Sequence, residues 1–461
     1  MAGVSFTHQP QDVAHVETKY RTIKTKIPVP ESVPLLEEMY ALECRAMHGQ
    51  LPVIWDSADN FQVKDKWGNV WLDFTSTIFV ANAGHANQRI IDRLQQLLNK
   101  PLLHSYTYAH DTRIAYLRKL NEVTAAQFEK AFMLSAGTEA TEVALKLMRM
   151  QGAKEGKRKG GIVCFSGAYH GRTMGAQMMT GNVAAKEWIG HHDAQIHHLP
   201  FPYPWLEEVQ QSPKAFFERT FEQMCEQQGL SAKEDICGFM IETFQGWGAV
   251  FYPDGFLEAL ADFAKENKIL IAFDEMQAGF GRTGTLFGYE HYNIEPDLLC
   301  LGKGASSGLP LSIVMGSQEL MDLPDIGSMS STHSANPLCC AAGLANLEAL
   351  FEDGLIDNSM VLGRVLHRKL SELKDRYPNV ISKICGKGLL AAVIFENANG
   401  EPLSELCDKV CEKAMQKGLL LVHTGRESIK IAPPLSIEED ALIEGVDVLA
   451  ECIAEAVEQT C

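Results

Sequence analysis

Short apolar segments that each end in a polar or glycine-rich cluster recur through the middle of the chain, and they restrict its fold more than any other feature. The segments lie at residues 130–135, 161–166, 236–242, 269–274 and 297–302. Helical patterns separate several of them, for example at residues 138–151 and 255–267. Because continuous apolar runs suit strands that are buried on both faces, this alternation predicts an α/β domain with a parallel sheet.

The regions on either side of this pattern have a different character. Residues 61–74 predict a β-hairpin around a turn at Trp67, Gly68 and Asn69. The chain from residue 345 to 377 is mostly helical, and later strand-like runs indicate a smaller sheet at residues 388–395 and 418–432. We therefore expect an N-terminal arm with part of a small domain at 1–70, a large domain at 71–344, and the rest of the small domain at 345–461.

The two ends of the chain carry more local signals. Residues 1–35 are polar, with prolines at positions 28, 30 and 34, which predicts a loosely structured arm. Near the other end, Ser436 and Glu439 have the spacing of a capping box for the last helix. One apolar stripe then follows for that helix to bury, at Leu442, Val446, Leu449, Ile453 and Val457.

The composition narrows the partners and the compartment. The net charge is −18 at pH 7, whereas nucleic acid and anionic membranes both require a basic face, so neither is expected as a partner. No apolar run is long enough to span a bilayer, and the first residues lack the apolar core of a signal peptide. The 12 cysteines include no CxxC pair, so we expect no zinc site and a cytoplasmic protein with reduced thiols.

Residues capable of chemistry follow the predicted strands. Because ligands of open parallel sheets bind beyond the carboxyl ends of the strands, these places should converge on one crevice. They hold a glycine turn, an aromatic ring, an amide, a carboxylate and a lysine, at residues 135–138, 167–171, 242–246, 274–275 and 303. This combination suits a phosphorylated aromatic cofactor.

The residues with the clearest chemistry also have ordinary structural explanations. Gly137 and Thr138 open a helix whose free N–H groups suit a phosphate, although an N-capped helix has the same pattern. Asp274 ends a buried strand and would pair with a protonated pyridine nitrogen, or act as a helix cap or ion-pair partner. Lys303 precedes a flexible loop, where it is either a nucleophile toward an aldehyde or a surface lysine.

Five further residues extend the candidate site. Tyr169 would stack on a cofactor ring with support from His170, or fill the core. Gln245 would bond a ring hydroxyl, or be a solvated loop amide. Ser331 and Thr332 would add phosphate contacts, or form a simple turn. The histidine pairs at 191–192 and 197–198 lie in a polar stretch that is expected to be exposed, and no suitably spaced acidic or cysteine ligand predicts a metal there.

With these residues in view, the chain resembles the class III aminotransferases, the fold-type I pyridoxal-phosphate group that includes the ornithine and 4-aminobutyrate aminotransferases. Seven motifs fall in the family's order: SAGTEATEVALKLMR (135–149), AYHGRT (168–173), IETFQG (241–246), FDEMQAGFGRTG (273–284), KGASSGLPLS (303–312), STHSANP (331–337) and KIAPPL (430–435). The resemblance runs from about Trp55 to about Leu449.

The resemblance implies a role for each residue of the site. Lys303 would hold pyridoxal 5'-phosphate as a Schiff base, Asp274 would pair with its pyridine nitrogen, and Tyr169 would stack on its ring. The remaining cofactor contacts that it implies are Ala136, Gly137, Thr138, His170, Glu242, Gln245, Gln277, Ser331 and Thr332. It also implies a mostly parallel seven-stranded sheet flanked by helices, beside a smaller α+β domain. Since Thr332 resembles a contact that comes from the neighbouring subunit, a homodimer or tetramer with the active site at the subunit interface is expected.

Three departures from the family concern the substrate pocket, to which we also assign Phe79. Many members that use glutamate carry an arginine where this chain has Lys430, and an acidic residue where it has Trp247. The frequent VRGxGL segment appears here as ICGKGL, with Cys385 in the place of the arginine. Because lysine cannot form the two-pronged contact of arginine with a carboxylate, a different gate for the substrate is expected.

The function that follows is transamination in two halves, from a primary amine or amino acid to a keto acid or aldehyde, with ping-pong kinetics. Two alternatives remain at this point. A racemase, aminomutase or decarboxylase would use the same residues and cofactor. A binding protein with a decayed site would keep the fold alone.

Overall fold

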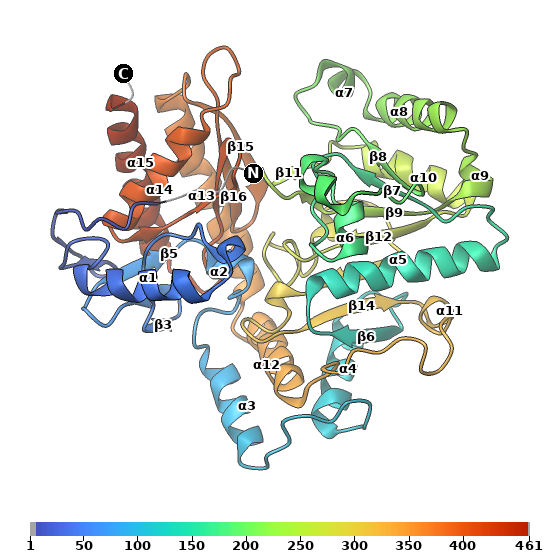
Figure 1. The fold of residues 1–461 in the computed structure, drawn as a ribbon, viewed down its shortest axis with the longest axis horizontal. Coiled ribbons are helices and arrows are strands. Elements are labelled where there is room, and N and C mark those ends of the chain that lie inside the picture. The colour runs from blue at the N-terminus through green and yellow to red at the C-terminus, as the bar shows by residue number, and fades with distance from the viewer. Residues whose placement is uncertain (1–5, 460–461) are drawn as a thin grey trace.

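A seven-stranded sheet forms the centre of the larger lobe of the molecule (Figure 1). The computed structural model describes residues 6–459, and in it the strand order is β6-β14-β13-β12-β9-β7-β8. The strands are β6 (Lys130–Leu134), β7 (Gly161–Phe165), β8 (Ile196–Leu199), β9 (Ile236–Glu242), β12 (Leu270–Asp274), β13 (Leu298–Leu301) and β14 (Ser312–Gly316). Only β14 runs antiparallel to its neighbours in this sheet. The mostly parallel sheet is therefore confirmed, and so are all five strands predicted from apolar runs; β8 and β14 were not predicted.

Both faces of this sheet are buried, because successive side chains of each strand enter different hydrophobic clusters. On one face, Cys164 and Met240 pack with Leu147 of α5 (Gly137–Lys154). On the other face, the strands pack against α8 (Pro213–Gln228) and α10 (Phe256–Asn267), through side chains such as Phe165, Phe239, Phe217 and Phe256. This two-sided burial is the physical reason for the continuous apolar runs.

The second histidine pair lies in β8, so the prediction of an exposed polar stretch was wrong for it. His197 is buried, and burial lowers its pKa. Burial also lowers the pKa of His198 to about 4, and its Nε2 lies 3.0 Å from the carbonyl oxygen of Met179. Both side chains are structural parts of a strand that pairs with β7.

The smaller lobe contains a four-stranded antiparallel sheet. Its order is β15 (Ile381–Lys387), β16 (Leu390–Phe395), β19 (Ser428–Ile431) and β18 (Val422–His423). Helices α13 (Leu355–Arg376), α14 (Ser404–Gln416) and α15 (Glu439–Glu458) complete this α+β unit, and the apolar stripe of α15 is buried as predicted at Leu442, Val446, Leu449 and Ile453. The predicted capping box was wrong: Glu438 is the N-cap of α15, and the Ser436 hydroxyl bonds the Asn60 side chain instead.

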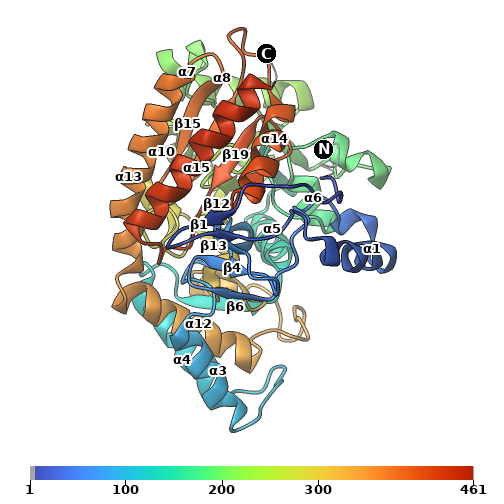
Figure 2. The ribbon, with the colours of Figure 1, turned by 90° about the vertical axis from the view of Figure 1, so that its left-hand side faces the viewer.

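A further sheet joins the two ends of the chain. It contains β1 (Val16–Glu17), β2 (Thr22–Ile23), β5 (Val70–Asp73), β4 (Gln62–Lys64) and β3 (Ser57–Asp59), and β17 (Leu419–Leu420) pairs with β5 in parallel. Pairing of β4 with β5 confirms the predicted hairpin. The N-terminal segment lies beside the C-terminal helices in both views (Figures 1 and 2), so the described part of the predicted loose arm is ordered by strand pairing.

Other helices surround these sheets. They are α1 (Val33–Leu42), α2 (Ser76–Phe79), α3 (Gln88–Leu98), α4 (Asp111–Val123), α6 (Met174–Met179), α7 (Glu207–Gln211), α9 (Ala232–Asp235), α11 (Gln318–Met321) and α12 (Pro337–Glu352); a short hairpin is formed by β10 (Phe244–Gln245) and β11 (Val250–Phe251). The expected boundaries at 70/71 and 344/345 fall inside β5 and α12, so the three-segment division stays a prediction. None of the helices within residues 6–459 has the length and apolar character needed to cross a membrane.

The fully buried guanidinium of Arg282 ties the two lobes together. Nη1 donates to the carbonyl oxygens of Leu389 (3.0 Å) and Pro433 (2.5 Å). Nη2 donates to Asn82 Oδ1 (2.9 Å) and to the hydroxyl oxygen of Ser76 (3.1 Å). Because these acceptors come from segments far apart in the sequence, one side chain satisfies several buried polar groups at once.

We expect Arg282→Ala to lower the free energy of unfolding by roughly 3–5 kcal/mol, because buried acceptors lose their donors and a large cavity opens. Urea unfolding followed by circular dichroism measures this change. Arg219→Ala is the matched control, since Arg219 is exposed and pairs with Glu208 on the surface. Equal unfolding midpoints for the two variants would contradict the joining role of Arg282.

Candidate active site

The carboxyl ends of several strands of the large sheet meet around one cavity of about 300 Å³. This confirms the predicted convergence. The wall consists of Gly137, Thr138, Tyr169, His170, Gly171, Arg172, Glu242, Thr243, Phe244, Asp274, Met276, Gln277, Ala278 and Lys303. Ala136, Gln245, Ser331, Thr332, Phe79, Trp247 and Lys430, which were also predicted to belong to the site, do not line this cavity.

Lys303 follows β13 at the edge of the cavity, and its amine is the candidate nucleophile. The strand β13 pairs in parallel with β12, which carries Asp274, so the two residues lie on neighbouring strands as predicted. Lys303 has a φ of 45°, a left-handed conformation that costs a non-glycine residue on the order of 1–3 kcal/mol. Burial lowers the pKa of Lys303, while Asp274 and Glu242 act in the opposite direction. A lowered pKa increases the neutral fraction of the amine, which is the reactive form.

Asp274 and His170 form a buried pair on the floor of the cavity. Asp274 Oδ2 lies 2.9 Å from His170 Nδ1, and Oδ1 accepts a hydrogen bond from the backbone N–H of Met276. The other ring nitrogen of His170, Nε2, is buried and has no hydrogen-bond partner within residues 6–459. Buried polar atoms are normally hydrogen-bonded, so an unpartnered ring nitrogen beside a buried carboxylate indicates room for a further polar partner in the cavity.

The first turn of α5 forms one wall of the cavity and suits an anion. Glu139 Oε2 accepts hydrogen bonds from the N–H groups of Ser135 and Ala136, outside the helix. The N–H groups of Gly137 and Thr138 belong to the first turn, where no intrahelical acceptor exists. A Cβ on Gly137 would lie 2.7 Å from Met276 Sδ, so glycine keeps this wall open. Positive potential at the helix start then favours a phosphate.

Two glutamines, both predicted as cofactor contacts, follow strands near the cavity. Gln245 is fully buried; its Nε2 donates to the carbonyl oxygen of Ser166 (2.7 Å), and its Oε1 accepts from Trp247 Nε1 (2.9 Å). The Gln245 amide is therefore held by groups of the protein itself, and its contact with a ring hydroxyl stays a prediction. Gln277 lines the cavity and is the available amide.

Arg172 was not among the predicted site residues, although it stands in the AYHGRT motif. Its guanidinium lies 5.9 Å from the ring centroid of Tyr169, and it lines both the first cavity and a second one of about 640 Å³. The second cavity is mostly apolar, with Trp55, Ile78 and Leu421 in its wall. The signal in the sequence was a cation three residues after Tyr169, the predicted stacking aromatic.

The geometry agrees with what comparison with known proteins shows. The family model described as Aminotransferase class-III matches residues 44–453. The chain belongs to the class III aminotransferases. A 2-aminoadipate transaminase of Pseudomonas putida is 34% identical to this aminotransferase, over 88% of this chain and 96% of its own. A 4-aminobutyrate aminotransferase of Mycobacterium leprae is 31% identical, over 94% of this chain and 98% of its own. Among solved structures, a thermostable (S)-enantioselective omega-transaminase from Thermomicrobium roseum has a TM-score of 0.82 at 27% identity, covering 92% of this chain and 98% of that one.

The aminotransferase is thus a pyridoxal-phosphate enzyme, and the residues of its cavity fit that cofactor. A half-buried amine suits the aldehyde, and the first turn of α5 suits the phosphate. The buried carboxylate of Asp274 suits the pyridine nitrogen, which it would keep protonated. Glu242 also lines the cavity, and burial raises its pKa to about 7.

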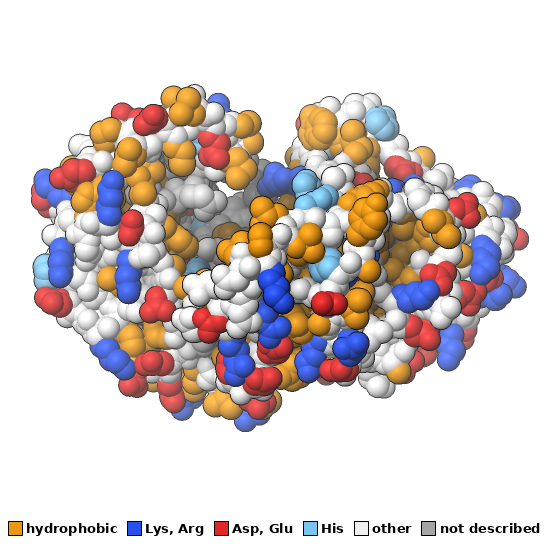
Figure 3. Space-filling model, turned by 90° about the horizontal axis from the view of Figure 1, so that it is seen from below, with side chains coloured by type: hydrophobic (Ala, Val, Ile, Leu, Met, Phe, Trp, Pro, Cys, Tyr) orange, Lys and Arg blue, Asp and Glu red, His pale blue; other side chains and the backbone are white. Residues whose placement is uncertain are grey.

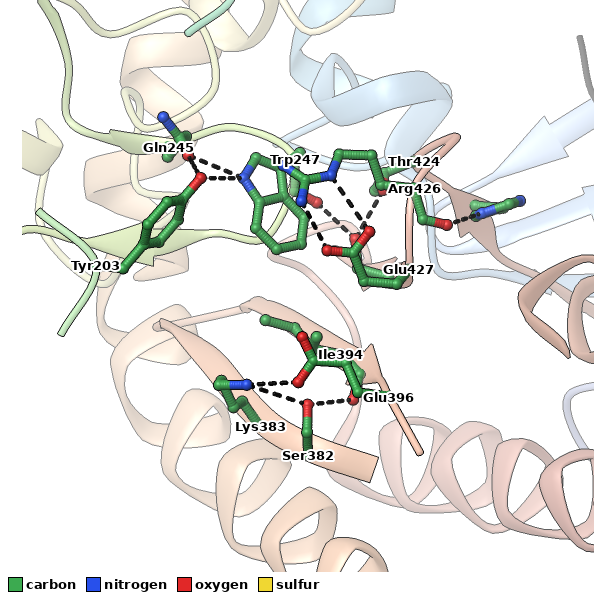
Figure 4. Close-up of polar contacts among 12 residues, drawn as sticks. Tyr203, Gln245, Trp247, Ser382, Lys383, Ile394, Glu396, Thr424, Arg426 and Glu427 are labelled. Atoms are coloured by element: carbon green, nitrogen blue, oxygen red, sulfur yellow. Dashed lines mark hydrogen bonds and ion pairs between the residues drawn. The ribbon is translucent and has the colours of Figure 1, made fainter. Parts of the chain in front are cut away.

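The three residues that we assigned to the substrate pocket lie behind the cavity wall. Trp247 is held between other side chains: Figure 4 shows Arg426 lying over the indole, with the guanidinium carbon 3.7 Å from its centroid, and Tyr203 on the other side. Lys430 and Phe79 are buried against each other, with Nζ 4.3 Å from the ring centroid. Neither Trp247 nor Lys430 lines the cavity, and their assignment to the substrate pocket stays a prediction.

Ser331 and Thr332 lie outside the cavity of their own chain. The Ser331 hydroxyl is 3.4 Å from Glu139 Oε1, near the start of α5. Thr332 is exposed, and its carbonyl oxygen lies 2.7 Å from His104 Nε2. The phosphate contact from Thr332 stays a prediction, because a single chain does not bring this residue to the site.

Proposed function

We propose that the aminotransferase acts on substrates that carry a carboxylate, and that Arg172 binds this group. The observation that carries the proposal is the place of Arg172 between the two cavities, where it is the one guanidinium among the described lining residues of either. Arginine binds carboxylates through two parallel hydrogen bonds. The names of the relatives support this, since 2-aminoadipate and 4-aminobutyrate both carry a carboxylate.

The residues of the site divide the work of amino transfer. Bound pyridoxal phosphate supplies an aldehyde for the donor's amine and a ring that withdraws electrons. We assign to Lys303 Nζ the removal of a proton from the amine-bearing carbon of the donor, and the delivery of a proton to the carbonyl carbon of the acceptor. Asp274 holds a proton on the ring nitrogen, and His170 fixes the orientation of Asp274. Tyr169 stacks on the ring, Gln277 donates to the ring oxygen, and Gly137 and Thr138 hold the phosphate.

We also assign a homodimer to the aminotransferase, with Thr332 reaching the partner's site. Hydrophobic side chains border a hollow between the lobes on the face seen from below (Figure 3). The segment between α3 and α4 exposes Leu102, Leu103, Tyr106 and Tyr108, and its His104 contacts the backbone of Thr332. Such exposed apolar side chains support a protein–protein contact there. A cytoplasmic location is supported by the eleven cysteines within residues 6–459 that form no disulfide.

A screen of donors against acceptors tests the function. Initial rates with an amino acid and a keto acid should give parallel double-reciprocal plots, as expected for ping-pong kinetics. Incubation of the holoenzyme with a donor alone should convert the cofactor to its amine form. Loss of donor chirality, or release of carbon dioxide, without that conversion would instead favour a racemase or a decarboxylase.

Replacing Arg172 should change substrate choice. We expect Arg172→Met to lower kcat/KM for a carboxylate-bearing donor by about 100-fold, because two charge-assisted hydrogen bonds are lost. The kcat/KM for a primary amine without a carboxylate should stay within about threefold of the unmodified enzyme, since this constant reports only the half-reaction of the donor, which makes no carboxylate contact. Arg219→Met is the control, because Arg219 also lies beside an aromatic ring, Phe216, but outside both cavities. Equal losses for both donors would refute a carboxylate contact.

A further inference from the structure

The amine of Lys430 is enclosed by groups of the protein itself. Its side chain is 4% exposed, and Nζ donates hydrogen bonds to the carbonyl oxygen of Gly246 (2.5 Å) and to Gln277 Oε1 (2.5 Å). The third direction faces the ring of Phe79, whose centroid is 4.3 Å away. An ammonium group has three N–H donors, and these three contacts account for all of them. No donor of Lys430 is left for a substrate carboxylate.

The contact with Gln277 decides which way that side-chain amide faces. Gln277 Oε1 accepts from Lys430, and Nε2 makes no hydrogen bond within the part of the chain that the structure describes. Gln277 lines the cofactor cavity, so this free donor belongs to the cavity wall. A Cβ on residue 246 would lie 2.8 Å from Nε2, so Gly246 leaves the amide its place. Rotation of the amide by half a turn would set Nε2 against Lys430 Nζ, with two donors facing each other.

We propose that Lys430 is a positioning residue, which holds the amide of Gln277 with its N–H donors toward the cofactor and takes no part in binding the substrate's carboxylate. The proposal rests on the function proposed above only in placing the cofactor's ring oxygen near Gln277. A neutral amine keeps two N–H donors, so Lys430 can serve both acceptors in either protonation state. Burial lowers the pKa of Lys430 to about 7, so both protonation states of this amine are accessible near neutral pH.

A double-mutant cycle between Lys430 and Gln277 tests this. We expect Lys430→Met and Gln277→Ala each to raise the dissociation constant of pyridoxal phosphate about 10-fold, as measured by fluorescence titration of the apoenzyme, because each removes one oriented hydrogen bond to a charged oxygen. Each should also shift the visible absorption band of the bound cofactor. The double variant should show no larger loss than Gln277→Ala alone, since Lys430 acts through that amide. Gln277→Glu, which still accepts from Lys430 but cannot donate, should weaken binding as Lys430→Met does.

The matched control is Lys383→Met. Lys383 lies in β15, the edge strand of the sheet that also contains Lys430, and pairs with Glu396 (Figure 4). It does not line the cavity, so its replacement should leave cofactor binding unchanged. Unchanged cofactor affinity and spectrum in Lys430→Met, or additive losses in the double variant, would overturn the proposal. If Lys430→Met raised only the KM for the keto acid, the proposal would be overturned as well, because Lys430 would then bind the substrate's carboxylate. Failure of the unmodified enzyme to transfer amino groups between carboxylate-bearing substrates would instead refute the proposed function.

Discussion

Replacing Lys303 with alanine should lower kcat for amino transfer by at least about 10⁴-fold, even with excess pyridoxal phosphate. Two roles are lost together: the amine that reacts with the aldehyde, and the group that carries the proton. The structure supports both, because Lys303 lies at the cavity, and burial lowers its pKa. The formation of keto acid from the donor under saturating conditions measures the loss.

Lys186→Ala is the control for that experiment. Lys186 is also buried and also has a lowered pKa, but its Nζ donates to the carbonyl oxygen of Met178, and it does not line the cavity. Its replacement should leave kcat within about threefold, because only local packing changes. Borohydride treatment should fix the cofactor on the Lys303 peptide of the unmodified enzyme. A Lys303→Ala enzyme that keeps a tenth of the activity would refute the assignment.

The positions of Lys303, Asp274 and Glu242 could be predicted because burial on both faces forces strands to be apolar. The end of each apolar run then marks where a strand leaves the core, and polar residues at that place face the same edge of the sheet. Two strands of the large sheet, β8 and β14, could not be predicted in this way. Strand β8 contains His197 and His198, which hide its apolar pattern, and β14 follows the loop after Lys303 directly.

The choice between Gln245 and Gln277 could not be made from the sequence. Each glutamine lies three residues after a strand-end carboxylate, Glu242 or Asp274. What separates them is the small β10–β11 hairpin, in which Gln245 pairs with Val250 and turns inward. The Gln245 amide then hydrogen-bonds groups from distant segments, namely the carbonyl oxygen of Ser166 and the hydroxyl of Tyr203. A local pattern contains no information on such long-range partners.

The substrate side of the pocket was the least predictable part. Lys430 and Trp247 differ from the residues that are common in the family at these positions. Their assignment to the substrate pocket rested on this difference alone. In the fold, Arg426 covers one face of Trp247, and Phe79 covers Lys430, so both are withdrawn from the cavity wall. Arg172 lies three residues after Tyr169 in the sequence, yet its place between two cavities depends on segments brought together only by folding.

Replacing Asp274 with asparagine should lower kcat by about 10³-fold while keeping the protein folded. Two opposite charges about 4 Å apart attract by about 4 kcal/mol at an effective dielectric constant of about 20. Loss of that attraction from the transition state corresponds to about three powers of ten in rate. Asparagine has the same shape, and its Oδ1 can still accept from the N–H of Met276. Stopped-flow measurement of a single turnover, with the cofactor's visible spectrum as the signal, measures the rate of the chemical step apart from product release.

Asp297→Asn separates the effect of the charge from the effect of a buried substitution. Asp297 is a partly buried carboxylate: its Oδ2 accepts from the N–H of Ile271, and desolvation raises its pKa to about 6. It does not line the cavity, so its replacement should change stability but leave the rate per folded molecule unchanged. The contrary result is an Asp274→Asn enzyme that is no slower than Asp297→Asn in the single turnover. Asp274 would then serve only to accept hydrogen bonds from the Met276 N–H and His170. Another group would have to neutralise the charge of the pyridine nitrogen.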